Sequence, residues 1–167
     1  RLQLNPRGLE LFSALAPKTS DSQSGTLYEG HDYAGIAAAV NYVLLMTYEW
    51  GYTYSEPMAV APINSVARVV RYALTRMPSD KIFMGIPTYG YDCVLPHVPG
   101  GAGARSISPV EAVNLARRYG ADILYDETVQ APWFRYADDD GRLHEVWVED
   151  VRSITAKLAL AASFDIY

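Results

Sequence analysis

Ten consecutive residues decide the fold: Val43-Leu44-Leu45-Met46-Thr47-Tyr48-Glu49-Trp50-Gly51-Tyr52. Their first half is apolar without a break, which is typical of a parallel strand that is covered on both faces rather than of a half-exposed strand. Their second half is aromatic and acidic. We therefore expect a buried strand over residues 42–48, followed at once by polar and aromatic side chains.

Two similar apolar runs, residues 9–15 and 81–88, lie on either side of this strand. Helical patterns separate the three runs, over residues 34–40 and 62–77. The second pattern is the clearer one, because Ile63, Val66, Val70 and Leu74 fall on one helical face. The order β-α-β-α-β predicts an α/β fold with right-handed parallel crossovers, as in a doubly wound sheet or a (β/α)8 barrel.

The pattern changes after Gly90. Residues 96–103 are rich in proline and glycine and predict a loop. A helix is expected from Ser108, with Pro109 in its first turn and Glu111 three residues after the cap, to Gly120. Strands are expected over residues 123–126, 133–136 and 143–148, with a hairpin turn at residues 138–141. A last helix over residues 149–163 would return the chain to the first layer, which gives three segments: 1–91, 92–148 and 149–167.

The composition excludes several classes of function. The 167 residues include 50% hydrophobic and 20% charged residues, which is typical of a folded globular domain. A net charge of −5 with no cluster of Lys and Arg argues against nucleic acid as a partner. No apolar run approaches the roughly 20 residues of a membrane span, and we expect no membrane partner. The three histidines show no metal-ligand spacing, so neither a metal nor another cofactor is expected.

Four stretches resemble, in order and spacing, the second half of family 18 glycoside hydrolases. Met46-Thr47-Tyr48-Glu49 resembles the end of that family's sixth barrel strand. Residues 12–18 and 82–91 are similar to its fifth and seventh strands, and residues 149–154 to the helix that follows its α+β insertion. The residues of these motifs most resemble those of the family's bacterial spore-cortex and cell-wall branch, whose members are often fused to LysM modules. The resemblance thus implies a partial (β/α)8 TIM barrel, strands five to seven, with an α+β insertion after the seventh strand.

The resemblance also implies an activity. Members hydrolyse β-1,4 bonds at N-acetylglucosamine by substrate-assisted retaining catalysis, in which the substrate's acetamide attacks the anomeric carbon. Tyr48 would donate to the acetamide oxygen, and Glu49, where most members have Asp, would tune the catalytic acid. That acid ends an Asp-x-x-Asp-x-Asp-x-Glu motif, which no stretch of this sequence matches. The isolated chain is therefore expected to hold the acetamide-binding half of the site and to be nearly inactive.

Further substrate contacts are expected from Met46, Trp50, Tyr89, Trp133 and Arg135. Aromatic faces stack on pyranose rings, and Met46 shares the strand face of Tyr48. Core packing is the alternative for Met46 and Trp133. The expected partners are an N-acetylglucosamine polysaccharide, either peptidoglycan or chitin, and the missing part of the barrel. The expected location is extracellular, or at the spore or cell wall, although the first residues show no secretory signal.

Three other interpretations stay open. The first is a non-catalytic, chitinase-like carbohydrate-binding protein that kept the cleft, and the second is a structural remnant without a ligand. The third is an unrelated (β/α)8 enzyme such as a phosphate-binding aldolase. That last alternative needs a lysine at the functional end of a strand, and Lys81 lies at a strand start.

Overall fold

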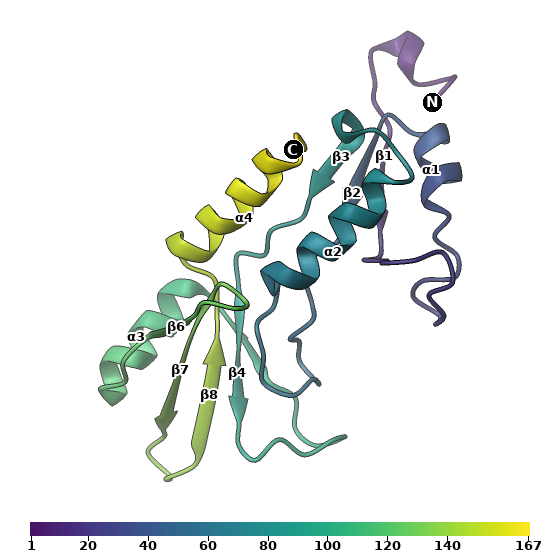
Figure 1. The fold of residues 1–167 in the computed structure, drawn as a ribbon. Helices are drawn as coiled ribbons and strands as arrows, with labels where there is room; N and C mark the ends of the chain where they lie inside the picture. The colour runs from purple at the N-terminus through teal and green to yellow at the C-terminus, as the bar shows by residue number, and fades with distance from the viewer. The chain divides into compact units, whose positions relative to one another are not determined.

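The computed structural model describes residues 1–167, which form two compact units (Figure 1). The first unit comprises Arg1–Thr47, Ser65–Gly85 and Leu158–Tyr167. The second comprises Tyr48–Asn64 and Ile86–Lys157. The chain passes from one unit to the other directly before Tyr48, within the stretch that the sequence marked out.

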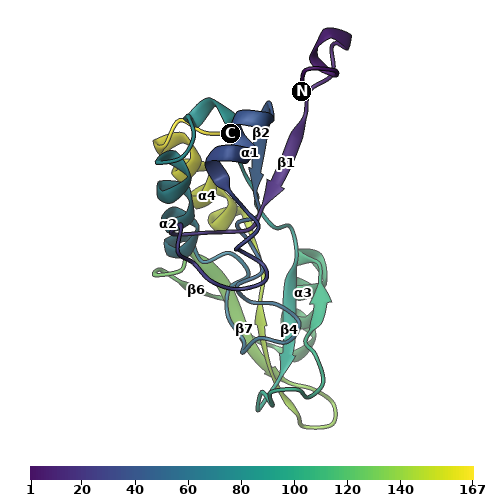
Figure 2. The same cartoon turned by 90° about the vertical axis from the view of Figure 1, so that its right-hand side faces the viewer.

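The first unit contains a three-stranded parallel sheet with the order β1-β2-β3. Its strands are β1 (Phe12–Leu15), β2 (Tyr42–Leu45) and β3 (Ile82–Met84), with β1 at one edge (Figure 2). Helix α1 (Tyr33–Ala39) connects β1 to β2, and α2 (Ile63–Leu74) precedes β3; short 3-10 turns lie at Asn5–Arg7 and Ser79–Lys81. The predicted α/β class and the parallel pairing are confirmed.

One face of this sheet is covered, whereas Phe12 on the opposite face is 49% exposed, so the expected cover on both faces is not found in this chain. Leu15, Val43 and Leu45 are buried in the sheet, and Val66 and Val70 are buried on the inner face of α2. The predicted helical spacing of α2 therefore describes its packing face. The third strand is shorter than the predicted 81–88, because parallel pairing with β2 ends at Met84.

The second unit contains a five-stranded antiparallel sheet with the order β5-β4-β8-β7-β6. The strands are β4 (Gly90–Val94), β5 (Arg105–Ile107), β6 (Leu124–Asp126), β7 (Ala131–Ala137) and β8 (Leu143–Trp147). The β7–β8 hairpin is confirmed, but β4 and β5 were not predicted. Their pairing is non-local, since β4 pairs with β8 about fifty residues later, and Gly90 has no room for a side chain beside the Trp147 carbonyl.

Helix α3 (Pro109–Tyr119) begins and ends as the sequence indicated. The Ser108 hydroxyl accepts from the Glu111 amide at 3.2 Å, and Gly120 ends the helix with a left-handed φ of 64°. The Glu111 carboxylate pairs with Arg105 rather than with the capping residue. Helix α4 (Val151–Ser163) starts two residues later than predicted, because the Asp150 carboxylate caps it by accepting from the amides of Arg152 and Ser153.

The antiparallel sheet has two different faces. Successive side chains of a strand point to opposite faces, and directly paired residues of antiparallel strands share one face. Helix α3 packs on the face that carries Phe134, Tyr136 and Val146 (Figure 1). We call this the α3 face. The opposite face carries Tyr91, Trp133, Arg135, Glu145 and Trp147, and we call it the platform face.

Candidate functional site

The site begins at a sharp turn after β2. Glu49 has a left-handed φ of 66°, an uncommon conformation for a residue with a side chain. Beyond it, the amides of Trp50 and Gly51 donate to the carbonyls of Val60 and Ala59, at 3.1 and 3.0 Å. Backbone strain of this kind persists only where surrounding structure enforces it, and it is concentrated at functional sites. Here the left-handed conformation places the Glu49 carboxylate within hydrogen-bond distance of two tyrosine hydroxyls of the second unit.

Two tyrosine hydroxyls bind the Glu49 carboxylate. Tyr91 donates to Oε1 at 2.9 Å, and Tyr89 donates to the same oxygen. Burial raises the pKa of both tyrosines above the ordinary value, and the Glu49 carboxylate raises it further. Both hydroxyls therefore keep their protons at neutral pH and hold one carboxylate oxygen, while the Glu49 side chain stays exposed.

Tyr48 lies beside this pair. Its half-buried ring packs against a cluster formed by Val60, Tyr91 and Cys93, to which Tyr89 also contributes. No hydrogen bond within the chain occupies its hydroxyl, so that group is available as a donor to a ligand. Burial raises the pKa of the Cys93 thiol to about 11, which leaves no reactive thiolate at neutral pH.

The platform face continues this site along the sheet. Tyr91 pairs with Trp147 in the strand register, and Trp147 pairs with Trp133. The two indole rings are stacked, with centroids 5.7 Å apart and planes at 18°. The Arg135 guanidinium lies 5.7 Å from the centroid of the Trp133 ring. Both tryptophans are only partly buried, so they are not the core of this unit, which is formed on the α3 face.

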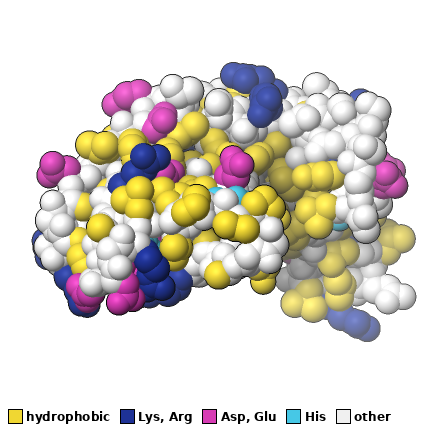
Figure 3. All heavy atoms as spheres, turned by 90° about the horizontal axis from the view of Figure 1, so that it is seen from below, with side chains coloured by type: hydrophobic (Ala, Val, Ile, Leu, Met, Phe, Trp, Pro, Cys, Tyr) yellow, Lys and Arg dark blue, Asp and Glu magenta, His cyan; other side chains and the backbone are white.

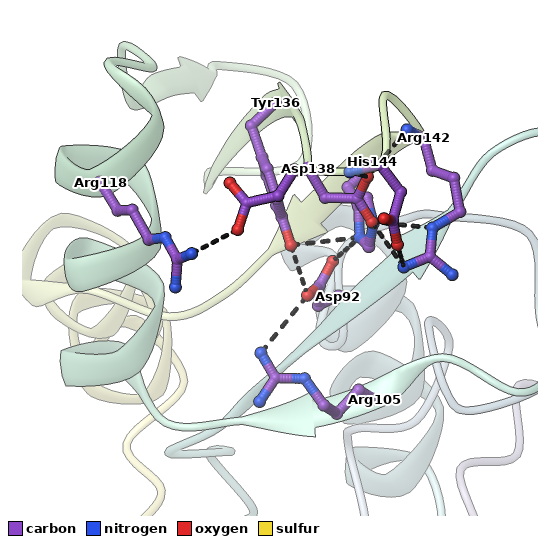
Figure 4. A network of polar contacts seen from close by, with 9 residues as sticks. Asp92, Arg105, Arg118, Tyr136, Asp138, Arg142 and His144 are labelled. Atoms are coloured by element: carbon purple, nitrogen blue, oxygen red, sulfur yellow. Dashed lines mark hydrogen bonds and ion pairs between the residues drawn. The ribbon is translucent and has the colours of Figure 1, made fainter.

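The α3 face contains a buried polar network instead (Figure 4). Asp92 accepts from the Tyr136 hydroxyl at 2.8 Å and contacts His144 Nδ1 at 2.7 Å. His144 Nε2 lies 3.2 Å from Asp138, whose carboxylate also accepts from Arg142 at 2.8 Å. The expected hairpin turn at residues 138–141 is present, but the Asp138 side chain turns inward and is only 12% exposed.

The electrostatics of Asp138 follow from these contacts. Burial acts to raise the pKa of its carboxyl, but hydrogen bonds from the Arg142 backbone and side chain and from His144 outweigh burial and lower that pKa to about 2. The network has one carboxylate on each side of the His144 ring. No group of three or more His, Cys, Asp or Glu side chains in residues 1–167 could hold a metal ion.

The structure gathers most of the predicted site residues in the second unit. Tyr48, Glu49 and Tyr89 lie together, and Trp133 and Arg135 lie together on the platform face. Trp50 is half-buried in the turn after Glu49, whereas Met46 belongs to the first unit.

Sequence reasoning missed Tyr91 and Glu145 as site residues. The signal for Tyr91 was its position two residues after Tyr89, since alternate residues of a strand share a face. Glu145 has the same relation to Trp147, because it lies two residues before it on the same strand.

One face of the molecule carries charges of both signs. Acidic and basic side chains lie among hydrophobic ones on the face that Figure 3 shows, and neither sign forms a large patch there. Surface ion pairs such as Arg118 with Asp139 account for part of this mixture. None of the helices combines the length and the apolar character that a bilayer span requires.

Comparisons of the sequence and of the structure with known proteins point to one family. The profile of glycosyl hydrolases family 18 matches residues 3–164. The cortical fragment-lytic enzyme of Bacillus subtilis is 52% identical over 159 residues, which cover 95% of this chain and 37% of the relative. The crystal structure of the Bacillus cereus spore cortex-lytic enzyme SleL superposes with a TM-score of 0.94 at 46% identity, over 96% of this chain and 37% of that one.

A chitinase from Chromobacterium violaceum superposes with a TM-score of 0.87 at 29% identity, over 98% of this chain and 50% of that chain. The chain thus spans little more than a third of the length of its spore-cortex relatives and half of this chitinase.

Proposed function

Because this chain belongs to glycosyl hydrolase family 18, we propose that it carries the acetamide-binding half of a glycosidase site that cleaves β-1,4 bonds at N-acetylglucosamine. The observation that carries the proposal is the arrangement around Glu49. Tyr89 and Tyr91 hold the Glu49 carboxylate by one oxygen, and Tyr48, whose hydroxyl makes no hydrogen bond within the chain, packs in the same side-chain cluster as these two tyrosines. Residues 1–91 and 149–167 would belong to a (β/α)8 barrel as its strands five to seven, and residues 92–148 to the insertion after the seventh strand.

The proposed chemistry is substrate-assisted retention. The acetamide carbonyl oxygen of the substrate attacks the anomeric carbon as the glycosidic C–O bond breaks, a general acid protonates the leaving oxygen, and positive charge develops on the acetamide nitrogen. Water then attacks the anomeric carbon of the resulting cyclic ion and restores the acetamide, which gives net retention. Tyr48 would donate its hydroxyl to the acetamide oxygen and hold it in line for attack. The exposed Glu49 carboxylate would lie near the developing charge, where a fixed negative group stabilises the transition state. Trp50 stays a proposed contact of the same sugar, and Met46 stays a proposed substrate contact.

The general acid is proposed to lie outside these residues, because no stretch of the sequence carries the family's acid motif. The relatives named as cortical fragment-lytic and spore cortex-lytic enzymes favour peptidoglycan over chitin as the polymer. Such a substrate fits an extracellular, spore or cell-wall location. The remainder of the barrel would be the polypeptide partner that completes the site.

A non-catalytic carbohydrate-binding protein is the second candidate. A cleft with Tyr48, Glu49 and Tyr89 would bind the polymer without cleaving it if the rest of the barrel supplied no acid. The two candidates differ in the chain that also contains the first half of the barrel. Turnover of purified peptidoglycan by that longer chain favours the glycosidase, and saturable binding without turnover favours the binding protein.

The half-site itself is tested by titrating the 167-residue chain with an N-acetylglucosamine hexamer. Tyr48→Phe removes one hydrogen bond to the ligand and is expected to weaken binding about tenfold at most. Tyr42→Phe is the matched control, because it removes a tyrosine hydroxyl at the start of β2, away from Glu49, where Tyr42 donates to Glu10. Hydrolysis by this chain that Tyr48→Phe abolishes would place an acid within residues 1–167 and contradict the half-site proposal.

A further inference from the structure

Glu145 is a buried carboxylate on the exposed side of the antiparallel sheet. Its side chain is 9% exposed, whereas that of its partner Arg135 is 56% exposed. Burying a carboxylate is costly unless charge and hydrogen bonds compensate for the lost water. The partners that compensate here both belong to the platform face, so Glu145 is linked to that face and not to the core.

Each oxygen of Glu145 binds one platform residue. Oε1 accepts from the Trp147 indole nitrogen at 2.7 Å. Oε2 accepts from Arg135 Nε at 2.8 Å and lies 2.7 Å from one of its terminal nitrogens. The carboxylate therefore fixes the ring of Trp147 and the fork of Arg135 at the same time. Glu145 thus restricts the rotation of two side chains that would otherwise be flexible.

The fixed groups have the chemistry of a sugar-binding surface. The indoles of Trp133 and Trp147 are stacked and partly exposed, and aromatic faces of this kind pack on the apolar face of a pyranose ring. The guanidinium of Arg135 lies against Trp133 and makes no hydrogen bond except to Glu145. Its remaining N–H groups are available for the acetamide, hydroxyl or carboxyl oxygens of a sugar.

We propose that Glu145 is a positioning residue, which orients Trp147 and Arg135 so that they and Trp133 bind a second N-acetylated sugar unit of the polysaccharide chain. This proposal deepens the proposed function and rests on it. The platform lies on the same face as Tyr91, which connects it along the sheet to Glu49. Glu145 itself would not touch the sugar.

The opposite face of the sheet supplies a matched control. Asp92 is also a nearly buried carboxylate, and Val146, its register partner in β8, is next in sequence to Glu145. Its partners Tyr136 and His144 lie within the α3 face. Asp92→Asn is therefore expected to lower stability without changing the platform, whereas a Glu145 variant should change the platform first.

The experiment measures two quantities at a temperature where every variant is folded: the near-ultraviolet circular dichroism of the tryptophans and the Kd for an N-acetylglucosamine hexamer. Glu145→Ala is expected to remove most of the dichroism of the stacked indoles and to weaken binding about tenfold. Glu145→Gln keeps an oxygen for the Trp147 indole but not the charge for Arg135. It should keep most of the dichroism and weaken binding about threefold.

The outcomes separate this proposal from the proposed function. Hexamer binding by Glu145→Ala and Glu145→Gln equal to that of the parent chain would overturn the positioning role. Equal weakening by Asp92→Asn would also overturn it, because the effect would then be one of general stability. If the Glu145 variants weaken binding and Tyr48→Phe does not, the result supports the role of the platform face and contradicts the acetamide-binding half-site. A parent chain that binds no hexamer removes both proposals.

Discussion

The two faces of the antiparallel sheet use the same strands for opposite purposes. On the α3 face, Phe134 is fully buried and packs in a cluster with Ala112 and Val146. On the platform face, its neighbour in sequence, Trp133, is partly exposed and stacks on Trp147. One residue of strand separates a core position from a candidate ligand contact. The comparison shows that strand alternation alone can divide stability from binding.

The buried carboxylates sharpen this contrast. Asp92 and Glu145 are buried to nearly the same degree, at 5% and 7% exposure. Asp92 binds Tyr136 and His144, which are themselves buried, and more distantly Arg105, an exposed side chain that also pairs with Glu111. We call this network closed, because each partner is engaged within the α3 side of the protein. Glu145 binds two partly or largely exposed side chains, so its network is open to a ligand. The buried charge of Asp92 therefore belongs to the packing of the α3 face, whereas that of Glu145 is proposed to orient ligand-binding side chains of the platform face.

The largest expected effect comes from the core position. Phe134→Ala leaves a cavity in the α3 face and is expected to lower the free energy of unfolding by about 4 kcal/mol. Trp133→Ala, one residue earlier, should cost less than half of that, because its ring is partly solvated, and it should abolish most hexamer binding. Urea unfolding and ligand titration measure the two effects. Similar stability losses for both variants would contradict the claim that the core lies on the α3 face and not on the platform face.

The next effect concerns the closed network. Asp92→Asn replaces a charged acceptor of Tyr136 and His144 by a neutral one and is expected to cost about 2 kcal/mol of stability. The shift should appear in the midpoint of urea unfolding, with the slope unchanged. Binding of the hexamer by the folded variant should match that of the parent chain. A changed Kd without a stability loss would assign Asp92 to the ligand site instead.

Acid should weaken the α3 face through Asp138. The folded-state pKa of this carboxyl, about 2, lies below the ordinary value of an aspartate near 3.9. Its ionised form therefore contributes stability that is complete above about pH 5 and is lost as the pH falls from about 4 towards 2. Asp138→Asn removes this titration, so the stability difference between the parent chain and the variant should shrink over that range. A constant difference from pH 6 to pH 2.5 would contradict the assignment.

The smallest effect is expected for an ion pair on the surface. Arg118 of α3 contacts Asp139 of the β7–β8 turn, and their side chains are 62% and 70% exposed. Asp139→Ala should change stability by less than about 0.5 kcal/mol and leave binding unchanged. This variant also tests the distinction between neighbouring aspartates, since Asp138 is engaged with His144 and Asp139 is not.

Local sequence patterns were enough to predict much of the fold. Continuous apolar runs predicted β1, β2 and β3, and cap residues such as Ser108 and Gly120 predicted the ends of α3. Strand β4 was missed because it contains Asp92 and Cys93, whose burial depends on pairing with a distant strand. Propensity along the chain contains no information about such a partner, since β-structure depends on its context.

The candidate site was predictable where a motif marked it. Tyr48 and Glu49 were identified by resemblance, and Tyr89 by its aromatic ring at the end of an apolar run. Asp138 was misread, because three aspartates before a glycine indicate a turn without indicating which carboxylate faces His144. Glu145 was missed because a single charged residue in a strand becomes informative only when its neighbours across the sheet are known.

The most direct test of the division between the faces is a titration of the isotope-labelled chain with the N-acetylglucosamine hexamer, followed by amide and indole N–H signals. The chain has three tryptophans, Trp50, Trp133 and Trp147, and each gives one indole signal. The account predicts that the signals of Trp133 and Trp147 shift saturably with the Tyr91 amide, while the amides of Ala112 and Val146 do not move. Shifts confined to α3 and the α3 face, with both platform indoles unchanged, would contradict it.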